Sequence, residues 1–163
     1  MKRSKRAEII CSSNKSNHFL YYITYIYLSQ VVYTCSMNKE EKLKTLSVEE
    51  IEVTQNKGTE ALFRNKYWDH HEGGDYLCKV CGVVLFKSDA KFDSKSGWPS
   101  FDKPADNNAV LFQEDTSHGM SRVEALCKNC GAHLGRVFND GPEETTGKRF
   151  CINSASLEFE KGK

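Results

Sequence analysis

Two pairs of cysteines in this sequence have the spacing that is typical of a metal site. Four of the seven cysteines form two motifs that share the pattern C-K-x-C-G-x-x-L, namely Cys78, Cys81, Cys127 and Cys130. Two residues between cysteines let one tight turn direct both sulfurs to a tetrahedral ion, at about 2.3 Å for zinc. The glycine after each pair suits the left-handed conformation that closes such a turn.

One pair alone would also fit a thioredoxin-like redox motif. Two near-identical motifs instead favour a single Zn²⁺ ion bound by four thiolates. Because 45 residues separate the pairs, we expect two hairpins to meet at the ion. A closed site leaves no ligand position for a substrate, so the predicted zinc is structural.

A fifth cysteine has polar neighbours that could make it a nucleophile. Cys151 follows Arg149 and Phe150 and precedes Ile152 and Asn153. In a strand, Phe150 and Ile152 would enter the core, and the other three would share the opposite face. We expect the Arg149 guanidinium to lower the pKa of the thiol from its ordinary value of about 8.5. The alternative is an inert, buried structural cysteine.

Two further side chains could serve the same site. His133 follows the second cysteine motif and could act as an acid or a hydrogen-bond donor near neutral pH. Trp98 lies in a turn with Gly97 and Pro99, and its ring could hold a small apolar or thioether group. A structural histidine and a core aromatic residue are the commoner alternatives, so both assignments depend on proximity to Cys151.

Short strands between turn signals must position these residues. The expected strands are 75–80, 83–86, 110–113, 122–126, 132–138, 148–154 and 157–159. Few windows have a long helical period, so the sequence predicts a mainly β, antiparallel fold. Ser47 and Glu50 form a capping-box pattern that predicts a short N-terminal helical arm, with Gly58 as its stop.

Residues 1–37 differ from the rest of the chain. They carry a net charge of +4, which leaves −3 for residues 38–163, so we expect no nucleic-acid partner. Their apolar run, 19–35, contains polar residues, and we expect no stable membrane span. The segment is either a targeting leader, with a mitochondrial or secretory-pathway location, or a gene-model artefact, with a cytoplasmic protein that starts at Met37.

The body of the sequence resembles the B-type methionine-R-sulfoxide reductases. The resemblance spans about residues 39–159, and it is carried by the segments 94–101, 127–138, 140–142 and 149–157. It implies a reductase domain at 38–163 with two antiparallel sheets, a four-cysteine zinc site and the helical arm. The implied reaction is thiol-dependent reduction of methionine-R-sulfoxide in oxidised proteins, with thioredoxin or a small thiol as reductant.

The resemblance also implies roles for individual residues. Cys151 matches the cysteine that attacks the sulfoxide sulfur and becomes a sulfenic acid. His133 matches a histidine that helps protonate the departing oxygen or orients water, and Trp98 matches the aromatic wall for the substrate's methyl group. The remaining matched positions are Arg149, which favours the thiolate, Asn153, which flanks the site, and Asp140, which supports its polar side.

Two positions depart from the family pattern. Arg136 stands where members commonly carry a second histidine, and arginine cannot donate a proton as an imidazolium does. We expect Arg136 to orient a water or bind the sulfoxide oxygen, and turnover to be reduced. Ser96 stands where many members place a resolving cysteine, so we expect the reductant to act on Cys151 directly. The alternative is a catalytically impaired, zinc-stabilised binding module; in either case we expect a monomer.

Overall fold

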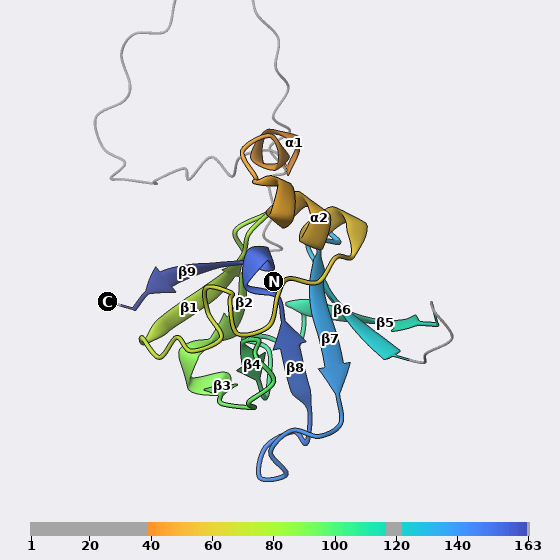
Figure 1. Cartoon of the computed structure of the whole chain (residues 1–163). Coiled ribbons are helices and arrows are strands. Elements are labelled where there is room, and N and C mark those ends of the chain that lie inside the picture. Colours follow the sequence, from red (N-terminus) through yellow and green to blue (C-terminus); the bar gives the residue numbers. More distant parts are fainter. Residues whose placement is uncertain (1–38, 117–121, 163) are drawn as a thin grey trace, which may run out of the picture. The chain divides into compact units, whose positions relative to one another are not determined.

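Two antiparallel sheets form the body of the protein in the computed structural model, which describes residues 39–116 and 122–162. The smaller sheet has the order β2-β1-β9, from strands β1 (Gly74–Cys78), β2 (Val84–Lys87) and β9 (Leu157–Lys161). The expected mainly β fold with two antiparallel sheets is confirmed (Figure 1). The expectations for residues 1–37 lie outside the described residues.

The larger sheet carries most of the residues that the sequence singles out. Its order is β3-β4-β8-β7-β6-β5, from β3 (Lys91–Phe92), β4 (Ser100–Phe101), β5 (Val110–Asp115), β6 (Arg122–Cys127), β7 (His133–Phe138) and β8 (Arg149–Ile152). Each of the seven expected strands has a counterpart whose ends lie within two residues. The two-residue strands β3 and β4 were not predicted, because two residues are too few to show alternation.

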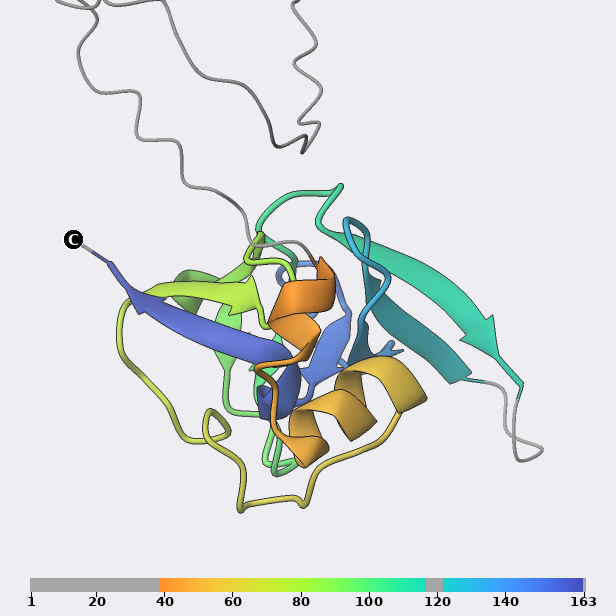
Figure 2. The ribbon, with the colours of Figure 1, turned by 90° about the horizontal axis from the view of Figure 1, so that it is seen from above.

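The helical arm consists of α1 (Lys39–Leu43) and α2 (Val48–Asn56). The expected capping box is present: the Ser47 backbone N–H donates to the Glu50 carboxylate at 2.8 Å, and the Glu50 N–H donates to the Ser47 hydroxyl at 3.2 Å. Helix α2 ends at Asn56, and the residue that stops it is Lys57, with a φ of 60°, one position before the expected Gly58. Figures 1 and 2 show α2 over one end of the sheets, where it packs against β7 and η3 (Ser154–Ser156).

Aromatic rings from both sheets fill the core between them. Phe86 of β2 stacks on Phe101 of β4 with ring centroids 4.4 Å apart, and both side chains are fully buried. Tyr76 of β1 meets Phe101 edge to face at 5.0 Å, and Phe150 of β8 lies 5.8 Å from Phe86. Because Phe150 and Ile152 point into this core, Cys151 between them points to the other face of the sheet.

The described residues contain two α-helices and two single-turn 3₁₀-helices, η1 (Ser88–Ala90) and η3. None of these helices is long and apolar enough to cross a membrane.

We predict that the Phe86→Ala variant loses about 3–5 kcal/mol of unfolding free energy, because it leaves a cavity beside Phe101. Urea denaturation measures this loss. The control is Val84→Ala on the same strand, where the side chain is 37% exposed and the loss should stay within about 1 kcal/mol. Equal losses in both variants would contradict the assignment of the core.

Candidate functional site

The two cysteine motifs form matching turns at the tips of two hairpins. In the first, the Cys78 N–H donates to the carbonyl of Val83, and the Gly82 N–H donates to the carbonyl of Cys78, both at 2.8 Å. The second turn repeats both bonds at 2.8 Å around Cys127. Gly82 and Gly131 have φ values of 73° and 74°, in the left-handed conformation that the sequence predicts. Each turn therefore directs its two sulfurs the same way.

The four sulfurs meet between the hairpins, all within 4.8 Å of one another. Cys78 Sγ lies 3.7 Å from Cys130 Sγ, and Cys81 Sγ lies 3.6 Å from Cys127 Sγ. Sulfurs placed 2.3 Å from a tetrahedral ion would be about 3.8 Å apart, so the cluster has the size of a four-thiolate metal site. Hydrogen bonds from the neighbouring thiols, that of Cys127 foremost, hold the pKa of Cys81 below its ordinary range.

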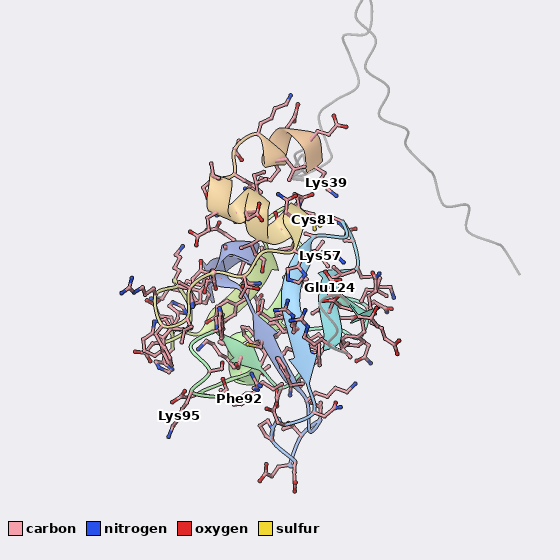
Figure 3. The ribbon with its side chains drawn as sticks, turned by 45° about the vertical axis from the view of Figure 1, so that its right-hand side comes forward. Lys39, Lys57, Cys81, Phe92, Lys95 and Glu124 are labelled. Atoms are coloured by element: carbon pink, nitrogen blue, oxygen red, sulfur yellow. The ribbon has the colours of Figure 1, made fainter. Side chains whose placement is uncertain are left out.

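Helix α1 lies beside the second hairpin. The ammonium of Lys39 donates to the carbonyl of Cys130 at 2.8 Å, and Figure 3 shows Lys39 and Cys81 in the same part of the molecule. Two of the four cysteines, Cys78 and Cys127, are almost completely buried. The cluster thus lies where the two sheets meet, and Cys81 and Cys130 are its partly exposed members.

Cys151 lines a cleft of about 230 Å³ on the outer face of β7 and β8. Three other residues that the sequence singles out line the same cleft, namely Trp98, Arg136 and Asn153. The structure adds residues that sequence analysis did not identify as cleft residues: Thr59, Arg122, Gly135 and Phe138. The walls are largely apolar around one thiol, so the cleft suits a small, weakly polar group bound next to sulfur.

The Cys151 thiol is less acidic than the sequence suggests. Burial raises its pKa above the ordinary value and outweighs the lowering by the Ser96 hydroxyl and the Arg149 and Arg136 charges. Ser96 Oγ lies 3.9 Å from the sulfur. Arg149 lowers the pKa of the thiol, as the sequence predicts, but the net shift is upward because desolvation of the anion is the larger effect.

Arg149 shares its charge with Asp140. Its Nε and one terminal nitrogen each donate to a carboxylate oxygen of Asp140 at 2.9 Å, and its guanidinium lies 4.4 Å from the centre of the Phe138 ring. This pair lowers the pKa of Asp140 and raises that of Arg149. Neither residue lines the cleft itself, so both sit at its edge and hold the β7–β8 loop.

His133 is buried behind the cleft rather than in its lining. Its Nδ1 lies 2.6 Å from the carboxylate of Glu124, and the other oxygen of Glu124 accepts from the ammonium of Lys57 at 2.7 Å (Figure 3). Burial lowers the pKa of His133 despite this carboxylate, so the imidazole is neutral at pH 7. Its Nε2 is buried and has no partner among the described residues. The sequence analysis did not identify Glu124, whose carboxylate holds both the His133 imidazole and the Lys57 ammonium.

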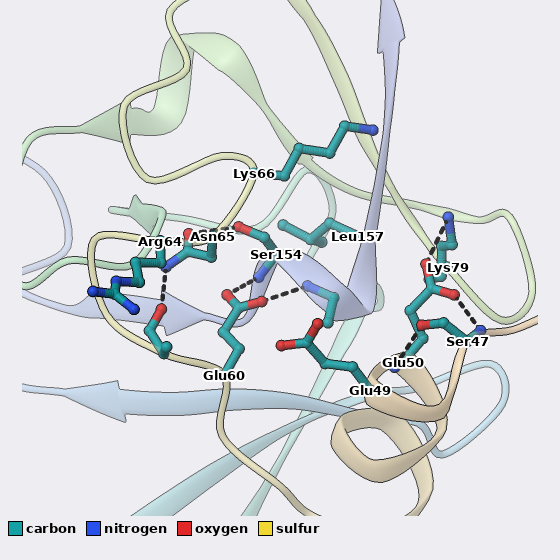
Figure 4. Close-up of a pocket in the computed structure, with 12 residues that line it drawn as sticks. Ser47, Glu49, Glu50, Glu60, Arg64, Asn65, Lys66, Lys79, Ser154 and Leu157 are labelled. Atoms are coloured by element: carbon teal, nitrogen blue, oxygen red, sulfur yellow. Dashed lines mark hydrogen bonds and ion pairs between the residues drawn. The ribbon is translucent and has the colours of Figure 1, made fainter.

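Glu60 connects the parts of the cleft. Its backbone carbonyl accepts from the Trp98 indole at 3.2 Å, and its backbone N–H donates to the Asn153 side chain at 3.2 Å. Its carboxylate accepts from the backbone N–H groups of Ser154 and Ala155, at the start of η3 (Figure 4). Sequence reasoning missed Glu60, since no pattern links it to segments about 40 and 90 residues away.

Figure 4 shows the residues of a second cavity, which Glu60 lines and which has a volume of about 340 Å³. Mostly charged and polar side chains line it, and its described lining contains no cysteine and no histidine. The cleft at Cys151 is therefore the better candidate for an active site.

Comparisons with known proteins agree with this assignment. The SelR domain model matches residues 46–161, which include both cysteine motifs and the whole cleft. A curated relative from Leptospira interrogans, named peptide methionine sulfoxide reductase MsrB, is 49% identical over 129 residues, or 79% of this chain and 98% of that protein. A protein of the same name from Thiobacillus denitrificans is 54% identical over 114 residues, or 70% of this chain and 86% of the relative.

A mouse relative extends the comparison to eukaryotes. Methionine-R-sulfoxide reductase B3, mitochondrial, from Mus musculus is 52% identical over 122 residues, or 75% of this chain. The match spans about half of the mouse protein, 48% of its length. Matches of this length and identity establish a family.

We predict that His133 makes the protein less stable as the pH falls below the ordinary imidazole pKa of 6.5. Because the folded-state pKa is lowered, the unfolded chain binds the proton more tightly, and stability decreases as pH falls through 6.5. His133→Gln should reduce this slope in urea unfolding between about pH 7.5 and pH 5.5. His71→Gln, at a side chain that is 71% exposed, is the control and should leave it unchanged. An unaltered slope in His133→Gln would exclude a neutral, buried imidazole.

Proposed function

This chain belongs to the SelR domain family of B-type methionine-R-sulfoxide reductases, and we propose on that premise that it reduces methionine-R-sulfoxide in oxidised proteins at Cys151. The observation that carries the proposal is the cleft, in which a partly exposed thiol lies among Trp98, Arg136 and Asn153. The reaction needs a sulfur nucleophile beside an apolar wall, and the cleft supplies both.

In the proposed reaction, the Cys151 sulfur attacks the sulfoxide sulfur and accepts the oxygen. The products are methionine and a sulfenic acid on Cys151, so the cysteine sulfur loses the two electrons that the sulfoxide sulfur gains. The thiol gives up its proton as it attacks, and the oxygen requires a proton as its bond to the substrate breaks. Because burial raises the pKa of the free thiol, we propose that Cys151 loses its proton during the attack and not before it.

The walls of the cleft determine how the substrate lies. The Trp98 ring supports a methyl group bound next to the thiol, and Glu60 fixes the position of this ring through the indole N–H. Arg136 is placed to bind the sulfoxide oxygen or to orient a water. His133 lies behind the cleft, on the side of Arg136, where its hydrogen bond to Glu124 holds it in place. Arg149 and Asp140 form an ion pair at the edge of the cleft.

Regeneration of the enzyme follows from Ser96. The Ser96 hydroxyl lies where a resolving thiol would have to stand, 3.9 Å from the Cys151 sulfur, and serine cannot form a disulfide. An external thiol therefore attacks the sulfenic acid, which releases water and forms a mixed disulfide. A second thiol then frees Cys151. Thioredoxin and small thiols are the candidate reductants.

The four-cysteine cluster binds one structural zinc ion in this proposal. The sulfur separations and the all-thiolate donor set suit tetrahedral Zn²⁺. Because β7 begins three residues after Cys130, the ion fixes the start of the strand that pairs with β8. The zinc takes no part in the reaction.

In this proposal the protein acts as a monomer whose reductase domain is residues 38–163. Residues 1–37 are a targeting leader or a gene-model artefact. Cytoplasm, mitochondrion and secretory pathway remain its candidate locations, and the N-terminus of the mature protein distinguishes them by mass spectrometry. The alternative of a non-catalytic binding module is not favoured, since the named relatives are reductases and the nucleophile is in place.

We predict that Cys151→Ser loses at least about a thousandfold in the rate of methionine formation from methionine-R-sulfoxide with dithiothreitol. The wild type should act on the R epimer and not on the S epimer, as epimer-resolved chromatography shows. Cys35→Ser, outside the described residues, is the matched control and should keep full activity. Full activity of Cys151→Ser would refute the mechanism, and no activity in the wild type would favour the binding module.

We also predict that the purified protein contains one zinc per chain and that Cys127→Ser contains none. Loss of the ion should lower the melting temperature by about 10 °C or more, because it joins two hairpins across 45 residues of chain. Elemental analysis and thermal denaturation measure both effects. The control is Cys151→Ser, which should retain the zinc and the melting temperature; zinc-free wild type of unchanged stability would contradict the proposal.

A further inference from the structure

Arg136 faces the nucleophile from the neighbouring strand. Strands β7 and β8 pair antiparallel with Arg136 directly opposite Cys151, and both residues line the same cleft. Side chains in such opposed positions have Cβ atoms about 4.5–5.5 Å apart. The guanidinium of Arg136 is therefore within range of a charge on the sulfur, across a cleft with largely apolar walls.

The charge of Arg136 is not matched by a carboxylate. In the part of the chain that the structure describes, Arg149 pairs with Asp140 at 2.9 Å and Arg122 pairs with Asp115 at 3.4 Å. Arg136 instead donates to the hydroxyl of Thr59 at 3.4 Å.

Glu124 is the acid next to Arg136 in the sheet, in register on β6. Both of its carboxylate oxygens already hold other partners, the ammonium of Lys57 and the imidazole of His133. Glu124 thus forms no salt bridge with Arg136, whose guanidinium lines the cleft.

The other groups that face Cys151 are few. Arg149 lies on the same strand and lowers the pKa of Cys151 by more than Arg136 does, although it shares its charge with Asp140. Ser96 Oγ approaches from the segment before β4, and Ser100 of β4 stands opposite Cys151 in register, so both contribute only hydroxyl groups. Of the three arginines near Cys151 that the structure describes, Arg122, Arg136 and Arg149, Arg136 is therefore the one whose charge has no carboxylate partner.

We propose that Arg136 is a positioning residue that stabilises the Cys151 thiolate by its permanent charge. This inference rests on the proposed function, in which Cys151 is the nucleophile. It adds to the sequence-based interpretation of Arg136, which expected this residue to orient a water or to bind the sulfoxide oxygen. A residue at this position that is always charged favours the thiolate at every pH at which the protein is folded.

Alkylation of Cys151 by iodoacetamide tests the proposal without a sulfoxide. The rate follows the thiolate fraction, and mass spectrometry of the Cys151 peptide from zinc-loaded protein separates it from the other cysteines. Arg136→Gln should move the midpoint of the rate against pH upward by about one unit, which makes alkylation about tenfold slower at a fixed pH below both midpoints. Arg136→Lys keeps the charge and should restore most of the rate.

The control is Arg122→Gln, which removes a cleft arginine that has a carboxylate partner, and its midpoint should match the wild type. The proposal is overturned if folded Arg136→Gln keeps the wild-type midpoint, or if Arg122→Gln shifts it equally. Should Arg136→Gln not fold, Arg136→His replaces it, and its neutral imidazole above about pH 8 should give the same slow alkylation. If Arg136→His is alkylated at the wild-type rate at that pH, the proposal is overturned.

The two proposals fail in different ways. If Cys151→Ser keeps its reductase activity while Arg136→Gln still shifts alkylation, the proposed function fails and the electrostatic role stands. If Cys151→Ser is inactive and Arg136→Gln alkylates as the wild type does, the electrostatic role alone is wrong.

Discussion

The antiparallel pairing of β7 with β8 is the constraint on which the site depends. It sets Arg136 opposite Cys151, and it continues beyond the strands, where the Asn153 N–H donates to the carbonyl of Leu134 at 2.8 Å. The strands come close enough only because residue 135 is glycine: a Cβ there would lie 2.1 Å from the carbonyl oxygen of Cys151. A side chain at this position would push the nucleophile away from the cleft.

Both strands are fixed from outside the pair. The cysteine cluster lies at the start of β7, where the proposed zinc would hold it, and the Glu60 carboxylate holds the end of β8 at η3. Glu60 also receives the indole N–H of Trp98, so the wall for the substrate and the strand of the nucleophile share one anchor. The cleft is thus set by segments that are distant in sequence, while its lining stays largely apolar. Burial in that lining explains the raised pKa of the Cys151 thiol. The charges of the nearby arginines act in the opposite direction, because they favour the thiolate.

Local patterns predicted what depends on local geometry. The two Cys-x-x-Cys motifs, the capping box at Ser47 and the alternation around Cys151 each need only neighbouring residues, and each has the expected form. The partners of Arg136 and His133 were beyond such patterns, because they depend on strand register and on Glu124 in another strand. The net direction of the thiol pKa was also missed, because burial of Cys151 is a property of the folded cleft. Resemblance to a family named the site residues, and the structure shows which of them line the cleft.

The central claim is that Cys151 takes the oxygen from the substrate and waits for an external thiol. A single turnover with methionine-R-sulfoxide, without reductant and with dimedone present to trap sulfenic acids, tests it by mass spectrometry. We expect one dimedone adduct on Cys151 for each methionine formed. Methionine formed while Cys151 stays unmodified, or enters an internal disulfide, would contradict it.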